Sequence, residues 1–153
     1  MTEYILIKDS SIHNKGIFAK RGIPKDTRII EYMGEKITKK EAEKRAENIL
    51  KKSKTNKTFG AVYIFELNKK YDIDGNLKSN PARYINHSCK PNCKTEIIKG
   101  KIWIIAKRNI LPGEEISYDY GYDINNFKEH ICRCGSKNCI GYIVGKEHWS
   151  KLK

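Results

Sequence analysis

The sequence has 153 residues, and 31 lysines and arginines against 18 aspartates and glutamates give it a formal net charge of +13. This length fits one folded domain with its own core, and 39% hydrophobic with 32% charged residues excludes an intrinsically disordered chain. No apolar run reaches the roughly 18 residues that a membrane span needs, so we expect no membrane contact and an intracellular monomer. Lysines are spread along the whole chain, which favours a solvated basic surface over a dedicated nucleic-acid site, although such a surface attracts acidic partners.

The first two thirds of the chain predict short strands and one helix. Runs rich in β-branched and aromatic residues predict strands at residues 4–8, 16–20, 28–33 and 61–67. Residues 38–52 predict an amphipathic helix, because Thr38 and Glu41 form a capping box and apolar residues recur at helical spacing.

Three glycine-containing pairs predict turns. Asp74-Gly75 marks one turn, Lys99-Gly100 predicts a hairpin within residues 94–107, and Pro112-Gly113 precedes a last strand-like run at residues 114–122. The sequence therefore predicts a mostly β fold with few helices.

Three cysteines lie in a segment that has little apolar material to fold on. Cys132, Cys134 and Cys139 form a C-x-C-x4-C pattern, which favours a structural zinc site with a fourth ligand from elsewhere in the chain. The candidates for this ligand are Cys89, Cys93, His130 and His148. Free thiols and disulfides are the alternatives, but five cysteines cannot all pair, and nothing indicates an oxidising compartment.

Two further segments concentrate polar and aromatic side chains. Asn86 and His87 either satisfy a local turn or bind a polar ligand. Tyr118, Tyr120 and Tyr122 alternate along a predicted strand and so share one face. That face is either a packing surface or a narrow aromatic channel suited to an aliphatic chain ending in an amine.

The order of these motifs is specific where each one alone is weak. HNKGIFAKRGI, IIEYMGEKIT, ARYINHSCKPNC, GEEISYDYGY and CRCGSKNCIGYI follow one another as in the SET-domain protein-lysine methyltransferases, which the chain resembles from about residue 4 to 144. It looks most like the branch that acts on a histone-tail lysine. The resemblance implies a SET fold of small β-sheets with a pseudoknot, a catalytic domain at residues 1–124 and a zinc-binding post-SET tail at residues 125–153.

The resemblance also implies roles for particular residues. Tyr120 matches the catalytic tyrosine, Tyr118 the position that limits how many methyl groups fit, and Tyr63 a tyrosine that borders the cofactor and the lysine channel. The positions that match S-adenosylmethionine contacts are His13, Lys15, Gly16, Phe18, Tyr63, Arg83, Asn86 and His87. The positions that match zinc ligands are Cys89, Cys132, Cys134 and Cys139, and Cys93 is left free.

One residue departs from the family pattern, since Asn14 stands where a glycine is usual. Asparagine tolerates positive φ, so we expect the turn to survive. Trp149, in the tail, is a packing residue or a cover for the adenine ring.

The resemblance implies an S-adenosylmethionine-dependent enzyme that mainly monomethylates a lysine of a histone or of another basic, nucleic-acid-associated protein, in the cytoplasm or at chromatin. The alternatives are an inactive SET-like module that binds chromatin or protein, and a basic zinc protein that binds nucleic acid. A basic body repels a basic tail, so we expect either a substrate already bound to nucleic acid or a locally acidic groove. Candidates for lining that groove are Glu31, Glu35, Glu66, Asp72, Asp74 and Asp119.

Overall fold

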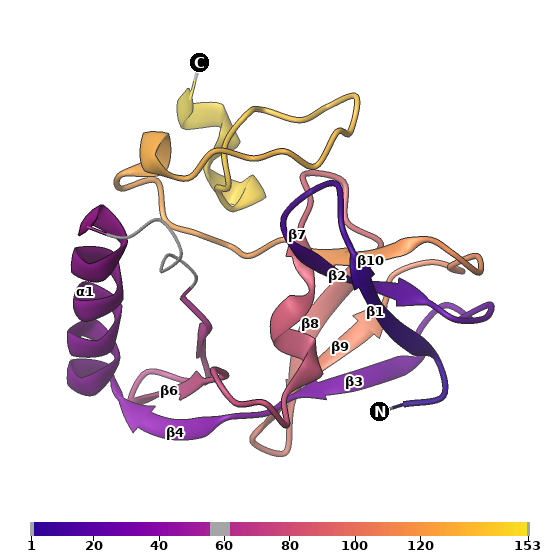
Figure 1. Cartoon of the computed structure of the whole chain (residues 1–153), viewed down its shortest axis with the longest axis horizontal. Coiled ribbons are helices and arrows are strands. Elements are labelled where there is room, and N and C mark those ends of the chain that lie inside the picture. Colours follow the sequence, from indigo (N-terminus) through magenta and orange to yellow (C-terminus); the bar gives the residue numbers. More distant parts are fainter. Residues whose placement is uncertain (1, 56–61, 153) are drawn as a thin grey trace. The chain divides into compact units, whose positions relative to one another are not determined.

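The computed structural model describes residues 2–55 and 62–152 (Figure 1). The chain folds into two compact units. The first consists of Met1–Ile30, Tyr84–Glu96 and Ile104–Lys153, and the second of Glu31–Arg83 and Ile97–Trp103.

The first unit contains a four-stranded sheet in the order β1-β2-β10-β7. The strands are β1 (Ile5–Asp9), β2 (Lys15–Ala19), β10 (Glu115–Tyr118) and β7 (Asn86–His87). β1 and β10 pair with β2 in antiparallel fashion, whereas β10 pairs with β7 in parallel. Ile17, Ile85 and Ile116 are at most 1% exposed, so an isoleucine-rich core lies against these strands.

The second unit contains the long helix and a small antiparallel sheet in the order β4-β6-β5. The elements are β4 (Glu35–Thr38), α1 (Lys39–Thr55), β5 (Ile64–Glu66) and β6 (Tyr71–Asp74). Thr38 Oγ1 accepts a hydrogen bond from the Glu41 N–H at 3.2 Å, which confirms that Thr38 caps the helix. The helix runs three residues beyond the predicted range.

A third sheet has the order β3-β9-β8, and its strands carry residues of both units. They are β3 (Arg28–Tyr32), β8 (Cys93–Ile98) and β9 (Lys101–Ala106). Lys99 and Gly100 between β8 and β9 have φ values of 50° and 75°. Two successive positive φ angles define the turn type that matches strand twist, so the predicted hairpin is confirmed.

Short 3₁₀ helices complete the described chain at η1 (Pro81–Tyr84), η2 (Phe127–Glu129) and η3 (Lys146–Leu152). The mostly β fold class is confirmed. None of the helices in residues 2–55 and 62–152 is long and apolar enough to cross a bilayer.

Two further predicted turns and the predicted strand at residues 61–67 have different outcomes. The Pro112-Gly113 turn is confirmed, with Gly113 at φ 87° and the Glu114 N–H bonded to the Leu111 carbonyl at 3.2 Å. At Asp74-Gly75 the chain turns as β6 ends, because the Asn76 N–H donates to Asp74 Oδ1 at 3.1 Å and the Leu77 N–H donates to the Gly75 carbonyl at 2.8 Å, and a second turn follows at residues 78–79. The predicted strand at residues 61–67 is shorter, and Ala61 lies outside the described residues.

Candidate functional site

Asn86 is the buried hub of the candidate site in the first unit. Its amide Nδ2 donates to the side chain of Glu115 (2.8 Å) and to the carbonyl of Lys15 (3.0 Å). Ser10 Oγ and the carbonyl of His13 lie at 3.2 and 3.4 Å from the same nitrogen. Asn86 therefore brings the predicted residues His13 and Lys15 to the end of β7, although they lie more than 70 positions away in the sequence.

The loop before β2 is shaped by one carboxylate that the sequence analysis did not identify. Ser10 Oγ donates to both oxygens of Glu115, at 2.8 and 2.9 Å, and the Ser10 N–H donates to the carbonyl of Asn14 at 2.8 Å. Asn14 has φ 36°, as expected for an asparagine that replaces a glycine in a turn. A side chain at Gly16 would place its Cβ 2.3 Å from Glu115 Oε1, so any other residue here requires the Glu115 carboxylate to move.

Phe18 lies on β2 opposite Leu6 of β1 and Glu115 of β10. Its ring is covered by the ammonium group of Lys8, 5.1 Å from the ring centroid. Phe18 thus contacts its neighbours in the sheet, whereas the carbonyl groups of His13 and Lys15 contact Asn86.

His87 is 3% exposed and links two parts of the site. Its Nδ1 accepts a hydrogen bond from the Tyr120 N–H at 3.1 Å, so the neutral ring carries its proton on Nε2. Nε2 lies 3.8 Å from Cys89 Sγ. Burial lowers the pKa of His87, and nearby Asp119 opposes the shift, so the imidazole is neutral at pH 7.

The three alternating tyrosines form a continuous row of rings. The ring centroids of Tyr118 and Tyr120 lie 5.1 Å apart, and those of Tyr120 and Tyr122 lie 5.5 Å apart. The hydroxyl of Tyr120 donates to the carbonyl of Ile85 at 2.6 Å, which fixes the direction of its O–H. Burial raises the pKa of Tyr122, and His130 packs edge-on against that ring at 5.0 Å.

Asn92 supports the strand that carries Tyr118. Its Nδ2 donates to the carbonyl of Glu115 at 2.8 Å, and its Oδ1 accepts from the Ser117 N–H at 3.0 Å. The side chain is buried, with 5% of the residue exposed. One amide group thus satisfies the two backbone groups of β10 that an adjacent strand would otherwise pair.

Two backbone N–H groups of the tail donate hydrogen bonds to the tyrosine segment. The Gly145 N–H donates to the carbonyl of Tyr122 at 2.9 Å, and the Lys146 N–H donates to Asp119 Oδ2 at 3.0 Å. The tail also carries an apolar cavity of about 520 Å³, lined by Phe127, Ile140, Tyr142, Trp149, Ser150 and Leu152. The indole N–H of Trp149 donates to the Val144 carbonyl at 3.1 Å, so Trp149 both packs on the tail and contributes to this cavity.

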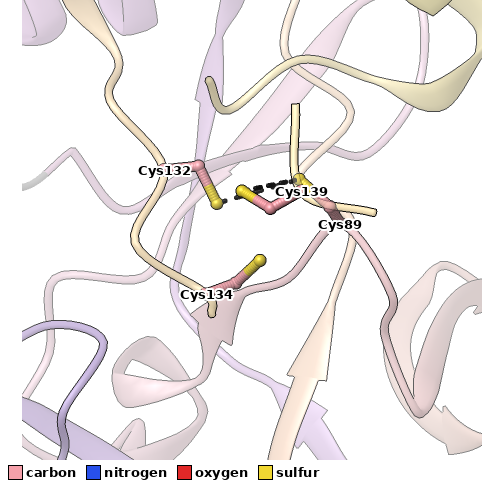
Figure 2. Close-up of side chains that lie close together, drawn as sticks. All are labelled: Cys89, Cys132, Cys134 and Cys139. Atoms are coloured by element: carbon pink, nitrogen blue, oxygen red, sulfur yellow. Dashed lines mark hydrogen bonds between the residues drawn. The ribbon is translucent and has the colours of Figure 1, made fainter. Parts of the chain in front are cut away.

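Four cysteines converge in the first unit, and Figure 2 shows their sulfurs turned toward one another. The Sγ atoms of Cys89, Cys132, Cys134 and Cys139 all lie within 4.8 Å of one another. Cys89 Sγ is 3.8 Å from the sulfurs of both Cys132 and Cys139. Zinc–sulfur bonds of about 2.3 Å in a tetrahedron place sulfurs about 3.8 Å apart, so this geometry fits a zinc ion.

The thiols of the cysteine cluster differ in pKa even without a bound cation. Burial raises the pKa of Cys89 to about 11 and raises that of Cys132 as well. Burial also acts against ionisation of Cys134, but hydrogen bonds from Ser136 and from backbone amides lower its pKa to about 6. A cation among the four sulfurs favours the thiolate form of each, which is the form that binds metal.

The other candidates for the fourth ligand lie elsewhere. Cys93 is 1% exposed, and burial raises its pKa to about 12, so it is an inert core thiol. His130 packs on Tyr122, and His148 lies 3.7 Å from Glu147. Among the described residues, the metal-competent group is the set of four cysteines named above.

Tyr63 and Arg83 belong to the second unit, and there they contact each other. The guanidinium carbon of Arg83 lies 5.7 Å from the centroid of the Tyr63 ring. The carbonyl of Tyr63 accepts a hydrogen bond from the Tyr32 hydroxyl at 2.6 Å. Their place beside the residues of the first unit stays a prediction.

The acidic residues proposed to line a groove are engaged by basic ones in the second unit. Arg45 Nη1 lies 2.9 Å from carboxylate oxygens of both Glu35 and Asp74. Lys39 Nζ lies 2.5 Å from Asp72 and 3.2 Å from Glu66.

The remaining two candidates are engaged as well. Lys101 lies 3.7 Å from Glu31, and Asp119 accepts hydrogen bonds from backbone N–H groups, among them that of Gly121 at 2.9 Å. All six carboxylates thus have partners, but these partners are only three basic side chains, Lys39, Arg45 and Lys101, together with backbone N–H groups.

The sequence was compared with known proteins. Residues 14–121, more than half of the chain, match the family model described as SET domain. The chain is 41% identical over 140 residues to "Histone-lysine N-methyltransferase trr" of Drosophila melanogaster, covering 88% of this chain and 6% of that protein. It is 40% identical over 138 residues to "Histone-lysine N-methyltransferase, H3 lysine-4 specific" of Schizosaccharomyces pombe, covering 88% of this chain and 14% of that protein.

A third relative has a different name. The chain is 41% identical over 147 residues to the "Variant-silencing SET domain-containing protein" of Plasmodium falciparum, covering 92% of this chain and 6% of that protein. The chain thus spans only a small part of the curated relatives that it matches. Its sequence and its fold nevertheless agree on one assignment: the chain belongs to the SET-domain family.

Proposed function

We propose that this chain transfers methyl groups from S-adenosylmethionine to a lysine of a protein substrate, a histone or another basic protein bound to nucleic acid. The SET-domain match and the names of the relatives support the reaction class. The observation that carries the proposal is the arrangement on β7 and β10, where Tyr118 pairs with His87 and the Tyr120 ring contacts both.

S-adenosylmethionine supplies the methyl group as an electrophile bound to a positively charged sulfur. We infer that the loop with His13, Lys15 and Gly16 holds it together with Asn86 and His87. The convergence of this loop on Asn86 Nδ2 supports that inference. Phe18, Tyr63 and Arg83 complete the proposed set of cofactor contacts.

The tyrosine row suits the other reactant, a lysine amine. At its reference pKa of about 10.4, only roughly one lysine in two thousand is neutral at pH 7, and the neutral form is the nucleophile. The apolar ring faces of Tyr118 and Tyr120 disfavour the charged ammonium form by desolvation. Because the Tyr120 hydroxyl donates its hydrogen to Ile85, its oxygen remains an acceptor for an amine N–H and can orient the nitrogen lone pair.

We infer that monomethylation dominates. Tyr118 is 6% exposed and lies next to Tyr120, so its hydroxyl occupies space that a methylated amine would need to turn. A second transfer requires that rotation. Tyr63 is the third tyrosine that we assign to the channel.

We infer that Cys89, Cys132, Cys134 and Cys139 hold a zinc ion that orders the tail at residues 125–153 against the catalytic part at residues 1–124. The ion supplies folding free energy that the tail's own side chains lack. The sulfur geometry and the scarcity of buried side chains in the tail support this inference.

The charge distribution favours a substrate that is bound to nucleic acid. The net charge is +13, and the acidic residues considered for a groove are paired or hydrogen-bonded. A free basic tail meets repulsion, whereas phosphates beside the substrate attract this surface. We therefore propose that a monomer works at chromatin or at another nucleoprotein.

The inactive-module alternative gains no support from the structure. Its basis was the departure at Asn14, and Asn14 adopts φ 36° and closes the loop through its carbonyl. The residues assigned to the reaction are otherwise those of the family motif.

The test incubates the protein and its Tyr120→Phe variant with labelled cofactor. Three substrates run in parallel: free histones, the same histones on DNA, and a whole-cell lysate. We expect label on the DNA-bound histones with the wild type and none with the variant. Cofactor binding without label in any lane would contradict the enzyme proposal. Label on a single lysate protein would replace histones as the substrate.

A further inference from the structure

We propose that Glu115 is a positioning residue that orients the amide of Asn86 and fixes the cofactor loop of residues 10–16. The proposal rests on the proposed function, since it names the residue that prepares the same site. Glu115 is the second glutamate of the GEE sequence, and it is not among the residues that the family resemblance assigns to the site.

The carboxylate of Glu115 ties together three segments that are distant in the sequence. Both of its oxygens accept from Ser10 Oγ, at 2.8 and 2.9 Å, and Oε1 also accepts from Asn86 Nδ2 at 2.8 Å. The backbone of Glu115 is fixed as well, because its carbonyl accepts from Asn92 and its residue pairs with Phe18 of β2. The acceptor is therefore held on a strand and does not depend on the loop that it organises.

This arrangement selects one orientation of the Asn86 amide. Its two amide hydrogens are directed to Glu115 and to the carbonyl of Lys15, its two shortest contacts. A flipped amide would place Oδ1 against a carboxylate and a carbonyl, which repel it. Glu115 thus leaves Asn86 Oδ1 as the hydrogen-bond acceptor for a ligand, and the cofactor's ammonium and amino groups are donors of the matching kind.

Glu115 also explains why residue 16 is a glycine. A Cβ at this position would lie 2.3 Å from Glu115 Oε1 and 2.9 Å from the Cβ of Ser10. Gly16→Ala therefore displaces the Glu115 carboxylate even when no cofactor is bound. The two positions should be coupled, so that Gly16→Ala weakens cofactor binding strongly beside Glu115 and much less in a Glu115→Ala background.

The experiment measures S-adenosylmethionine binding by calorimetry and the steady-state constants for cofactor and peptide separately. The variants are Glu115→Ala, Glu115→Gln and Ser10→Ala. Glu114→Gln is the matched control, because Glu114 is the neighbouring glutamate but pairs with Arg108 on the surface. Thermal unfolding and zinc content are recorded for every protein.

We expect Glu115→Ala to weaken cofactor binding roughly tenfold to a hundredfold, the loss of a charge-assisted hydrogen bond. The KM for cofactor should rise while the KM for peptide stays, which a general loss of stability would not produce. Glu115→Gln keeps an acceptor oxygen and should restore most of the binding. Ser10→Ala, at the edge of the loop, should weaken binding in the same direction even if Glu115→Ala does not fold.

Two results would overturn the proposal, and they differ. If the wild type binds cofactor and the Glu115 and Ser10 variants bind it equally well, the positioning role fails and the proposed function stands. If the wild type itself binds no cofactor, the proposed function fails and the positioning role fails with it.

Discussion

The strands β7 and β10 and the tail at residues 125–152 belong to the same unit, but they are ordered by different means. Around the strands, Ile17, Ile85 and Ile116 are at most 1% exposed. Among the described residues 125–152, the buried side chains are those of Cys132 and Val144, and one bridge joins Ile131 to Tyr142. Figure 1 draws this region in orange to yellow as coil with short helical turns.

The strands and the tail serve two different requirements of the proposed reaction, the positioning of the reacting groups and the covering of the site. The groups proposed to touch the reacting atoms lie where apolar packing and hydrogen bonds hold them within small tolerances. The tail has few buried side chains, and it contributes three of the four converging sulfurs, with Cys89 as the fourth. We therefore expect that the tail can be disordered chemically without dismantling the strands.

Metal removal should have the largest effect. A structural zinc ion in a small site contributes about 10 kcal/mol or more of binding free energy, which the apo tail loses. We expect a chelator to abolish hydrogen-exchange protection in residues 125–152 and to leave that of β1, β2 and β10 in place. Mass spectrometry of exchanged peptides measures both regions at once.

Matched cysteine variants provide the control. Cys132→Ser should release the metal, whereas Cys93→Ala should retain it, because the Cys93 thiol is a buried core group whose pKa is raised to about 12 by burial. Equal zinc content in the two variants, or loss of protection in β2 together with the tail, would contradict the separation of the two regions.

Tyr120→Phe should come next in size and should affect turnover far more than stability. The hydroxyl donates to the Ile85 carbonyl, so its removal costs about 1 kcal/mol of stability. Loss of the oxygen that orients the amine should lower kcat about a hundredfold or more. Turnover of labelled cofactor and thermal unfolding are measured side by side. A variant that retains full turnover would remove Tyr120 from the site.

Asn92→Ala tests whether the strand region depends on its own hydrogen bonds. The change leaves the Glu115 carbonyl and the Ser117 N–H without their partner, and we expect the free energy of unfolding to fall by about 2 to 4 kcal/mol. Zinc content should not change, because the two hydrogen bonds of Asn92 go to β10 and not to the cysteine cluster. Denaturant unfolding of the zinc-loaded protein measures the loss, and an unchanged midpoint would show that packing alone holds β10.

Tyr118→Phe should have the smallest effect on stability, but it should change the number of methyl groups in the product. Removing one hydroxyl near Tyr120 should leave the melting temperature within a few degrees and raise the fraction of di- and trimethylated lysine. Mass spectrometry of a methylated peptide reads the ratio. The same ratio in both proteins would place the product limit elsewhere.

The sequence predicted those features that local pattern determines. The helix followed from a capping box and an apolar stripe, and the β8–β9 hairpin from Lys99-Gly100. Strands β4, β6 and β7 were missed, because runs of two to four residues are too short to show a period. The pairing of β7 with β10 brings the NHSC and tyrosine segments side by side, and the threading of a pseudoknot there stays a prediction.

The site residues that lie within sequence motifs were predicted. The residues whose side chains meet only in the folded protein were missed. Spacing alone left four candidates for the fourth sulfur or imidazole ligand, and the resemblance selected Cys89, which lies with the other three. Ser10 and Glu115 are 105 positions apart, and no local pattern connects a serine in a loop to a glutamate after a turn. Contacts of this kind depend on tertiary structure.

His87 has a consequence that reaches from the sulfur cluster to the aromatic row. One edge of its imidazole receives the peptide N–H of Tyr120, and the opposite edge faces the Cys89 sulfur at 3.8 Å. One buried ring thus links the Cys89 sulfur to the backbone of the tyrosine segment, so the position of either one constrains the other.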